Sequence, residues 1–173
     1  TPTASNVAVV NSTGDATDAA AGDGVCATGA LNSAGDPECT LRAALREADA
    51  SALVDTIHFD IPTSDPGHAA GTWTITPAAG NRLPSITAPV TIDATTQPGA
   101  VPNTAVAPAP MNGRLAIELS GAADDSTVDW DGLVITAGGG GTEVRGISFV
   151  HWDNGTSDAI LAWQSSNNLI AGN

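Results

Sequence analysis

The acidic residues of the C-terminal half are the side chains whose type and spacing suit chemistry. Asp131 and Asp158 open two similar segments, DGLVI and DAILA, twenty-seven residues apart. If these segments lie on neighbouring parallel strands, the two carboxylates lie about 4.8 Å apart, a spacing that suits acid–base catalysis or a bound cation. Further polar and aromatic candidates in this region are Asp124, Asp125, Asp129, Asp153, Arg145, His151 and Trp152.

The face formed by Asp131, Asp158 and Trp152 is therefore the candidate carbohydrate-binding face. Aspartate is also a favoured turn residue, and a tryptophan beside an aspartate is common in surface turns. The turn interpretation is favoured, so no residue is assigned a catalytic role.

A second group of carboxylates lies near the N-terminus. Asp15, Asp18 and Asp23 fall in the turn-rich segment STGDATDAAAGDG, residues 12–24. Calcium takes several oxygen ligands from short loops, so this group is a candidate Ca²⁺ site. Its spacing does not follow the alternate positions of an EF-hand, and a solvated acidic loop is the favoured alternative. No other cofactor is expected.

The two cysteines favour a disulfide. Cys26 and Cys39 each lie in a loop rich in Gly, Asp and Pro, and no histidine is close to either in sequence. An even number of cysteines in such loops fits a bridge better than free thiols, and zinc is a weaker alternative. A disulfide indicates an oxidising compartment, so we expect a secreted or cell-surface protein.

One helix is predicted, over residues 41–50, with Thr40 as its N-cap. Its apolar stripe is formed by Leu41, Ala44, Leu45 and Ala48. The polar residues of the helix, Arg42, Arg46 and Glu47, lie off that stripe. A helix this short needs another element to pack against.

From residue 55 onward the apolar pattern changes to the period of two that is typical of strands. Short strands alternate with turns rich in Gly, Asn and Asp, and a Pro-rich segment at about 95–112 is predicted to be a surface loop. Two pairs of similar short segments, spaced by twenty-six and twenty-seven residues, favour a solenoid. A sandwich of short strands is the alternative. The residues expected to face the core are Ile57, Phe59, Trp73, Ile75, Val90, Ile92, Leu115, Ile117, Leu133, Ile135, Val144, Ile147, Ile160 and Leu169.

The segments GDGVC (22–26) and CTLRAALREA (39–48) resemble the CSLREA-type module, found at the start of bacterial secreted and surface proteins that contain right-handed parallel β-helices. The similarity covers nearly the whole chain and continues through DTIHF, LPSITAPVTID, TQPG, DGLVIT and TEVRGISF. Thr40 stands where the name motif has serine, which keeps the hydroxyl cap. The resemblance implies an all-β right-handed parallel β-helix with one short N-terminal capping α-helix. Leu41, Leu45 and Ala48 would form the capping face.

Composition excludes several classes of function. The 173 residues include nineteen Asp and Glu, five Arg and no Lys, giving a formal charge of −14. So few cations cannot neutralise a nucleic-acid backbone or an anionic membrane. No apolar run approaches the ~20 residues of a spanning helix, so no membrane insertion is expected.

These observations predict a non-enzymatic extracellular structural or adhesion module. Residues 1–54 would form the N-terminal cap and residues 55–173 the β-helix coils, continuing beyond residue 173 in a longer protein. One alternative is the N-terminal part of a polysaccharide lyase or glycoside hydrolase. Another is a subunit of a head-to-tail extracellular filament. The expected partners are a carbohydrate or surface ligand, or a second copy bound at the open C-terminal β-helix edge.

Overall fold

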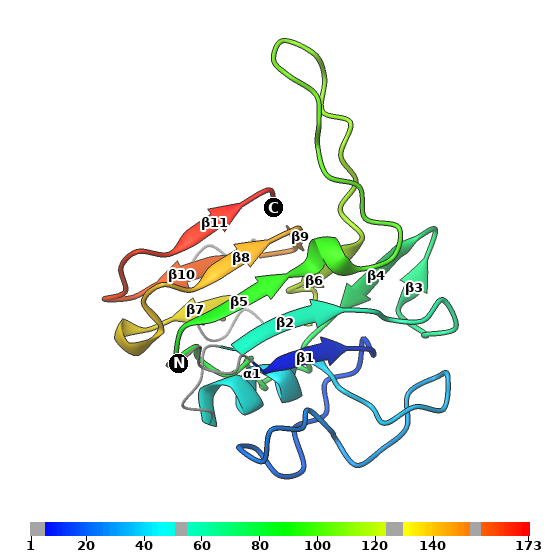
Figure 1. Cartoon of the computed structure of the whole chain (residues 1–173), viewed down its shortest axis with the longest axis vertical. Coiled ribbons are helices and arrows are strands. Elements are labelled where there is room, and N and C mark those ends of the chain that lie inside the picture. Colours follow the sequence, from blue (N-terminus) through cyan, green and yellow to red (C-terminus); the bar gives the residue numbers. More distant parts are fainter. Residues whose placement is uncertain (1–5, 51–54, 124–129, 153–156) are drawn as a thin grey trace.

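The computed structural model describes residues 6–50, 55–123, 130–152 and 157–173. Figure 1 shows one α-helix and many short strands, with the strands β1 and β11 at opposite edges of the largest sheet. In chain order the elements are β1 (Val7–Val10), α1 (Leu41–Ala50), β2 (Asp55–Phe59), β3 (His68–Ala69), β4 (Thr72–Ile75), β5 (Val90–Asp93), the 3-10 helix η1 (Ala94–Thr96), β6 (Ile117–Ser120), β7 (Leu133–Ile135), the 3-10 helix η2 (Ala137–Gly139), β8 (Glu143–Arg145), β9 (Ile147–Val150), β10 (Ile160–Ala162) and β11 (Leu169–Ala171). Within these ranges, neither α1 nor the 3-10 helices could cross a membrane, being too short and insufficiently apolar.

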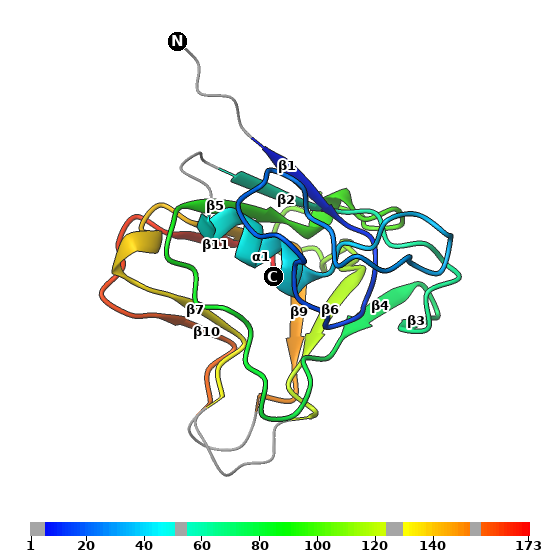
Figure 2. The same cartoon turned by 90° about the horizontal axis from the view of Figure 1, so that it is seen from below.

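The strands form three sheets, and Figure 2 shows them around a common interior with α1 across one end. The largest sheet has the order β1-β2-β5-β8-β11 and is parallel throughout. The second sheet, β10-β7, is also parallel. The third, β3-β4-β6-β9, is mixed because β3 and β4 run antiparallel while the other pairs run parallel.

Alternation of buried and half-exposed residues along the strands builds the core. In β2 the side chains of Asp55, Ile57 and Phe59 are buried, while Thr56 and His58 between them are less so. Successive side chains of a strand point to opposite faces, so one face of each strand supplies the interior. Most of the residues expected to face the core are buried. The differences are Leu115 and Ile160, which are half-buried, and Leu169, which is 48% exposed on the last strand of its sheet.

The helix α1 occupies the range that the spacing of its apolar residues predicts. The Thr40 Oγ1 accepts a hydrogen bond from the Ala43 N–H at 3.0 Å, which is the N-cap geometry expected for threonine. Leu41, Leu45 and Ala48 are buried, and the helix contacts β1 and β2. It therefore closes the interior at the β1 end of the molecule (Figure 2).

The predicted all-β right-handed parallel β-helix is wrong for this chain. The structure is mixed α/β, about 10% helical, with parallel and mixed sheets, and no solenoid is detected in the described part of the chain. A solenoid repeats at a fixed period. Here the chain between paired residues is about twice as long from Thr91 to Glu143 as from Glu143 to Leu169. The sequence echo near twenty-six residues describes only the C-terminal pairs.

The Pro-rich segment forms a projecting arm, here defined as residues 100–113. Its base is closed by an antiparallel bridge, in which Val101 and Arg114 exchange backbone hydrogen bonds of 2.9 and 2.8 Å. Across the arm, the Asn112 Oδ1 accepts from the Ala105 N–H and the Asn103 Oδ1 accepts from the Asn112 N–H. Figure 1 shows the arm standing well beyond the body of the molecule, on the same side as β11.

Candidate functional site

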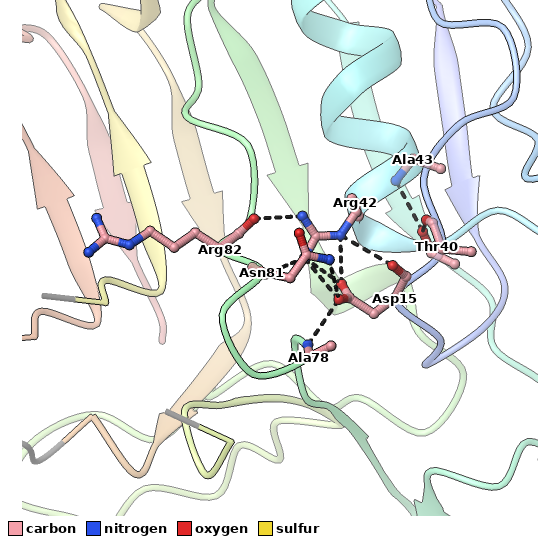
Figure 3. A network of polar contacts seen from close by, with 8 residues as sticks. Asp15, Thr40, Arg42, Ala43, Ala78, Asn81 and Arg82 are labelled. Carbon is pink, nitrogen blue, oxygen red and sulfur yellow. Dashed lines mark hydrogen bonds and ion pairs between the residues drawn. The ribbon is translucent and has the colours of Figure 1, made fainter. Parts of the chain in front are cut away.

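Asp15 and Arg42 form a little-exposed ion pair at the centre of a network of hydrogen bonds (Figure 3). The Arg42 Nε and Nη2 atoms each lie 2.9 Å from an Asp15 carboxylate oxygen, so the pair is bidentate. The two side chains are only 5% and 13% exposed. A buried ion pair of this geometry is stable only when further hydrogen bonds satisfy its remaining polar atoms.

The neighbouring backbone supplies those further hydrogen bonds. Arg42 donates to the carbonyl oxygens of Asn81 and Arg82, both at 2.6 Å. Asp15 accepts from the Ala78 N–H at 2.9 Å. The network thus joins the N-terminal loop, α1 and the loop that follows β4. The Arg42 guanidinium and the Asp15 carboxylate both contact more than one of these segments.

The other two carboxylates of the candidate calcium group bond to backbone elsewhere in the same loop. Asp18 accepts from the N–H groups of Ala20 and Ala27, at 2.7 and 3.0 Å. Asp23 accepts from the Val25 N–H at 2.9 Å. No group of three or more His, Cys, Asp or Glu side chains placed to hold a metal is found among the described residues. The three aspartates therefore make separate sets of contacts here, and the Ca²⁺ site stays a prediction.

Glu47 holds the N-terminal loop through its carboxylate, a role that the sequence pattern did not indicate. It is 5% exposed, and its two carboxylate oxygens accept from the N–H groups of Gly22 and Gly24, at 2.5 and 2.6 Å. Both glycines have positive φ, +96° and +86°, a conformation that turns nearby N–H groups toward one anion. The Gly-Asp-Gly pattern at 22–24 was the available signal for such a site.

The predicted disulfide between Cys26 and Cys39 is confirmed. It ties the acidic loop to the residue just before the helix cap, Thr40. The same loop is also tied to the helix by Glu47. The segment from the end of β1 to the start of α1 is therefore fixed by one covalent bond and by two charged side chains of α1.

Two members of the candidate carbohydrate face, Asp131 and Trp152, form hydrogen bonds to backbone. Asp131 and Asp158 precede the paired strands β7 and β10, and the Asp131 carboxylate accepts from the Asp158 N–H at 2.8 Å. Asp131 is 7% exposed, whereas Asp158 is exposed. The buried carboxylate thus caps the start of the next strand, as expected for a turn aspartate.

Trp152 packs against glycine backbone on this face. Its indole N–H donates to the Leu119 carbonyl at 3.3 Å, and the side chain is half-buried. A Cβ placed on Gly121 or Gly132 would lie 2.8 or 3.1 Å from the ring. The absence of side chains at these two glycines creates the room for the ring, so Trp152 acts as a packing residue here.

We expect Gly132→Ala to lower the free energy of unfolding by about 1–3 kcal/mol, the usual cost of overpacking. The added methyl group would overlap the Ala159 carbonyl oxygen as well as the Trp152 ring. Chemical denaturation measures the loss, and the matched control is Gly35→Ala, where no atom lies within 4 Å of the new Cβ but φ is +91°. A Gly132→Ala variant no less stable than the Gly35→Ala variant would contradict this packing.

The remaining candidates do not converge on one site. Arg145 forms an ion pair with Glu143 on the same strand. His151 Nδ1 lies 3.2 Å from the Ser120 hydroxyl. Four of the candidate aspartates, Asp124, Asp125, Asp129 and Asp153, lie outside the described residues.

An open groove with a volume of about 300 Å³ lies at the base of the arm. The arm contributes Val101 and Met111 to its wall, and the end of the chain contributes Ala171 and Asn173. The groove is mostly apolar, with Arg114 and Arg145 among its lining residues. It therefore brings together two segments far apart in sequence.

In comparisons with known proteins, no family model, no curated protein and no solved structure matches this chain. The resemblance to the CSLREA-type module is not tested by these comparisons and stays a prediction.

Proposed function

We propose that this chain is a non-enzymatic structural or adhesion module of a secreted or cell-surface protein. The observation that carries the proposal is the use made of its carboxylates. Asp15, Glu47 and Asp131 are acids of low exposure, and each accepts a hydrogen bond from a backbone N–H group of another segment. Groups engaged in this way order loops, and they are poorly placed to move protons to or from a substrate.

The extracellular placement is supported by the disulfide. Bridges of this kind form and persist in oxidising compartments, whereas cytosolic thiols are kept reduced. The surface charge is also in keeping with this placement, since a net charge of −14 favours solubility and opposes non-specific association. The CSLREA-like segments, as a resemblance, point to the same class of protein.

The adhesive part of the proposal is supported by the arm. The arm stands well away from the body, and its apolar side chains Val106 and Met111 are 81% and 78% exposed. Exposed apolar side chains on a projection are accessible to another molecule, and burying them there would be favourable.

Incubation with pectin, alginate and related polymers, with and without calcium, tests the proposal. We expect no new reducing ends and no unsaturated products. Asp131→Asn serves as the matched variant, because it removes the buried carboxylate of the candidate face. Turnover by the purified chain would overturn the structural role, and its loss in Asp131→Asn would assign it to the candidate face.

A further inference from the structure

Positive charge is scarce in this chain, yet two arginines meet in one groove. The sequence carries five arginines and no lysine against nineteen acids. Arg114 and Arg145 both line the groove of about 300 Å³ at the base of the arm. No Asp or Glu is among the described residues that line it. The groove therefore differs in charge from the protein as a whole, whose formal charge is −14.

Arg114 is fixed at the base of the arm by both its backbone and its side chain. Its backbone exchanges hydrogen bonds with Val101, and its Nη2 atom donates to the carbonyl oxygens of Ala70 and Gly71, at 3.3 and 2.5 Å. Ala70 and Gly71 have positive φ, +52° and +80°, and a Cβ on Gly71 would overlap the guanidinium. The turn between β3 and β4 thus holds the cation in place, and a preorganised group loses less entropy on binding a ligand.

Arg145 lies on the solvent-facing side of β8, with its side chain 44% exposed. It forms an ion pair with Glu143 on the same strand and lies opposite Asp93 on β5. The Asp93 carboxylate accepts from the N–H and the hydroxyl of Thr95, at 3.0 and 2.5 Å. Glu143 is therefore the acid that competes with a ligand for Arg145. A guanidinium has five N–H donors, so Arg145 can contact Glu143 and still donate into the groove.

The rest of the groove is mostly apolar. The arm contributes Val101 and Met111, which are 49% and 78% exposed, and Ala100 and Leu115 lie on either side of the arm. Sites for small molecules typically combine an apolar wall with a few placed polar groups and have volumes of about 300–1,000 Å³. The groove has this composition, and its volume suits a ligand at the small end of that range.

We propose that this groove binds a small molecule with an apolar body and one carboxylate group. The inference rests on the proposed adhesive role and names the class of ligand. Two guanidinium groups favour a carboxylate, because hydrogen bonds between arginine and carboxylate are charge-assisted and directional. The apolar wall favours a body that leaves water on binding. A cation would meet both arginines and is disfavoured.

Titration of the ¹⁵N-labelled chain with hexanoate, followed by NMR, tests the proposal. We expect saturable one-to-one binding that shifts the backbone N–H signals of Gly113 and Gly146, two residues that line the groove. Hexanol has a similar apolar body without the charge, and it should bind at least about tenfold more weakly. Glucuronate keeps the carboxylate on a hydroxyl-rich body and should also bind more weakly than hexanoate.

Substitutions of charged residues give a second readout. Arg114→Gln and Arg145→Gln should each weaken hexanoate binding by about tenfold, because each removes a charged donor. Arg46→Gln, at an exposed position of α1, is the matched control and should leave the affinity unchanged. Glu143→Gln should strengthen binding several-fold, because it frees Arg145 from its exposed ion pair. Loss of folding cannot produce that increase.

Two exposed residues of the arm test the apolar wall. Met111 lines the groove, whereas Val106, 81% exposed, is not among the lining residues. Met111→Ser should weaken hexanoate binding, and Val106→Ser should leave it unchanged. Thermal unfolding of each variant shows whether its fold is kept.

The absence of saturable hexanoate binding would overturn the proposal. Equal affinity for hexanoate and hexanol would also overturn it, as would affinities that Arg114→Gln and Arg145→Gln leave unchanged. These outcomes are independent of the turnover assay. A chain that binds no carboxylate and degrades no polymer contradicts only the groove site, whereas turnover contradicts the structural role whatever the groove binds.

Discussion

Replacing Arg42 by alanine is expected to lower the free energy of unfolding by about 3–5 kcal/mol. The substitution leaves the Asp15 carboxylate, 13% exposed, without its counter-ion. It also removes the donor to the carbonyl groups of Asn81 and Arg82, so the loop after β4 loses its attachment to α1. Urea denaturation followed by circular dichroism measures the loss.

Arg46→Ala is the matched control for this prediction. Arg46 lies on the same helix four residues later and is exposed. Surface substitutions of this kind change stability by less than about 0.5 kcal/mol. Equal losses in Arg42→Ala and Arg46→Ala would mean that the effect comes from helix propensity or net charge, and not from the buried pair.

Removing the Cys26–Cys39 bridge is the second large effect. The bridge closes a loop with a sequence separation of 13, and restricting the unfolded chain by a loop of that size contributes about 3 kcal/mol. We therefore expect the double variant Cys26→Ala/Cys39→Ala to be less stable by about 2–4 kcal/mol. The same denaturation experiment measures it, with and without reductant.

Reductant provides the control within that experiment. It should destabilise the native protein by a similar amount and leave the double variant unchanged. Mass spectrometry of alkylated secreted protein gives the complementary result, since two free thiols there would contradict the bridge. A double variant as stable as the native protein would show that the hydrogen bonds accepted by Asp18 and Glu47 suffice to order the loop.

Local elements could be predicted from the sequence because their signals are local. The apolar spacing of Leu41, Leu45 and Ala48 with the Thr40 hydroxyl defines α1, and the alternation at Asp55–Phe59 defines β2. The disulfide followed from the composition of the cysteine loops. Each of these signals depends on residues that are close together in the sequence.

Burial of the polar face of α1 could not be predicted in this way. Arg42 and Glu47 lie off the apolar stripe, which would expose them on an isolated helix, yet they are 4% and 5% exposed. The loops around Gly22 and Asn81 cover them and supply their partners. Such coverage depends on contacts between segments far apart in sequence, which periodicity does not record.

The fold class was predicted wrongly for a related reason. The echo between Asp131 and Asp158 describes only the C-terminal strands, and the earlier connections have other lengths. Leu169 was expected in the core from its alternation, but it is 48% exposed on β11, which among the described residues pairs only with β8. Pattern alone does not show where a sheet ends.

The central claim is that the carboxylates suited to chemistry serve the fold, and a double-mutant cycle between Asp15 and Arg42 tests it most directly. The free energies of unfolding of Asp15→Ala, Arg42→Ala and the double variant would be measured in EDTA and in calcium. We predict a coupling energy of about 1–3 kcal/mol that is the same in both solutions. Additive losses in EDTA, or stability that rises with calcium only when Asp15 is present, would contradict the claim and indicate a metal site.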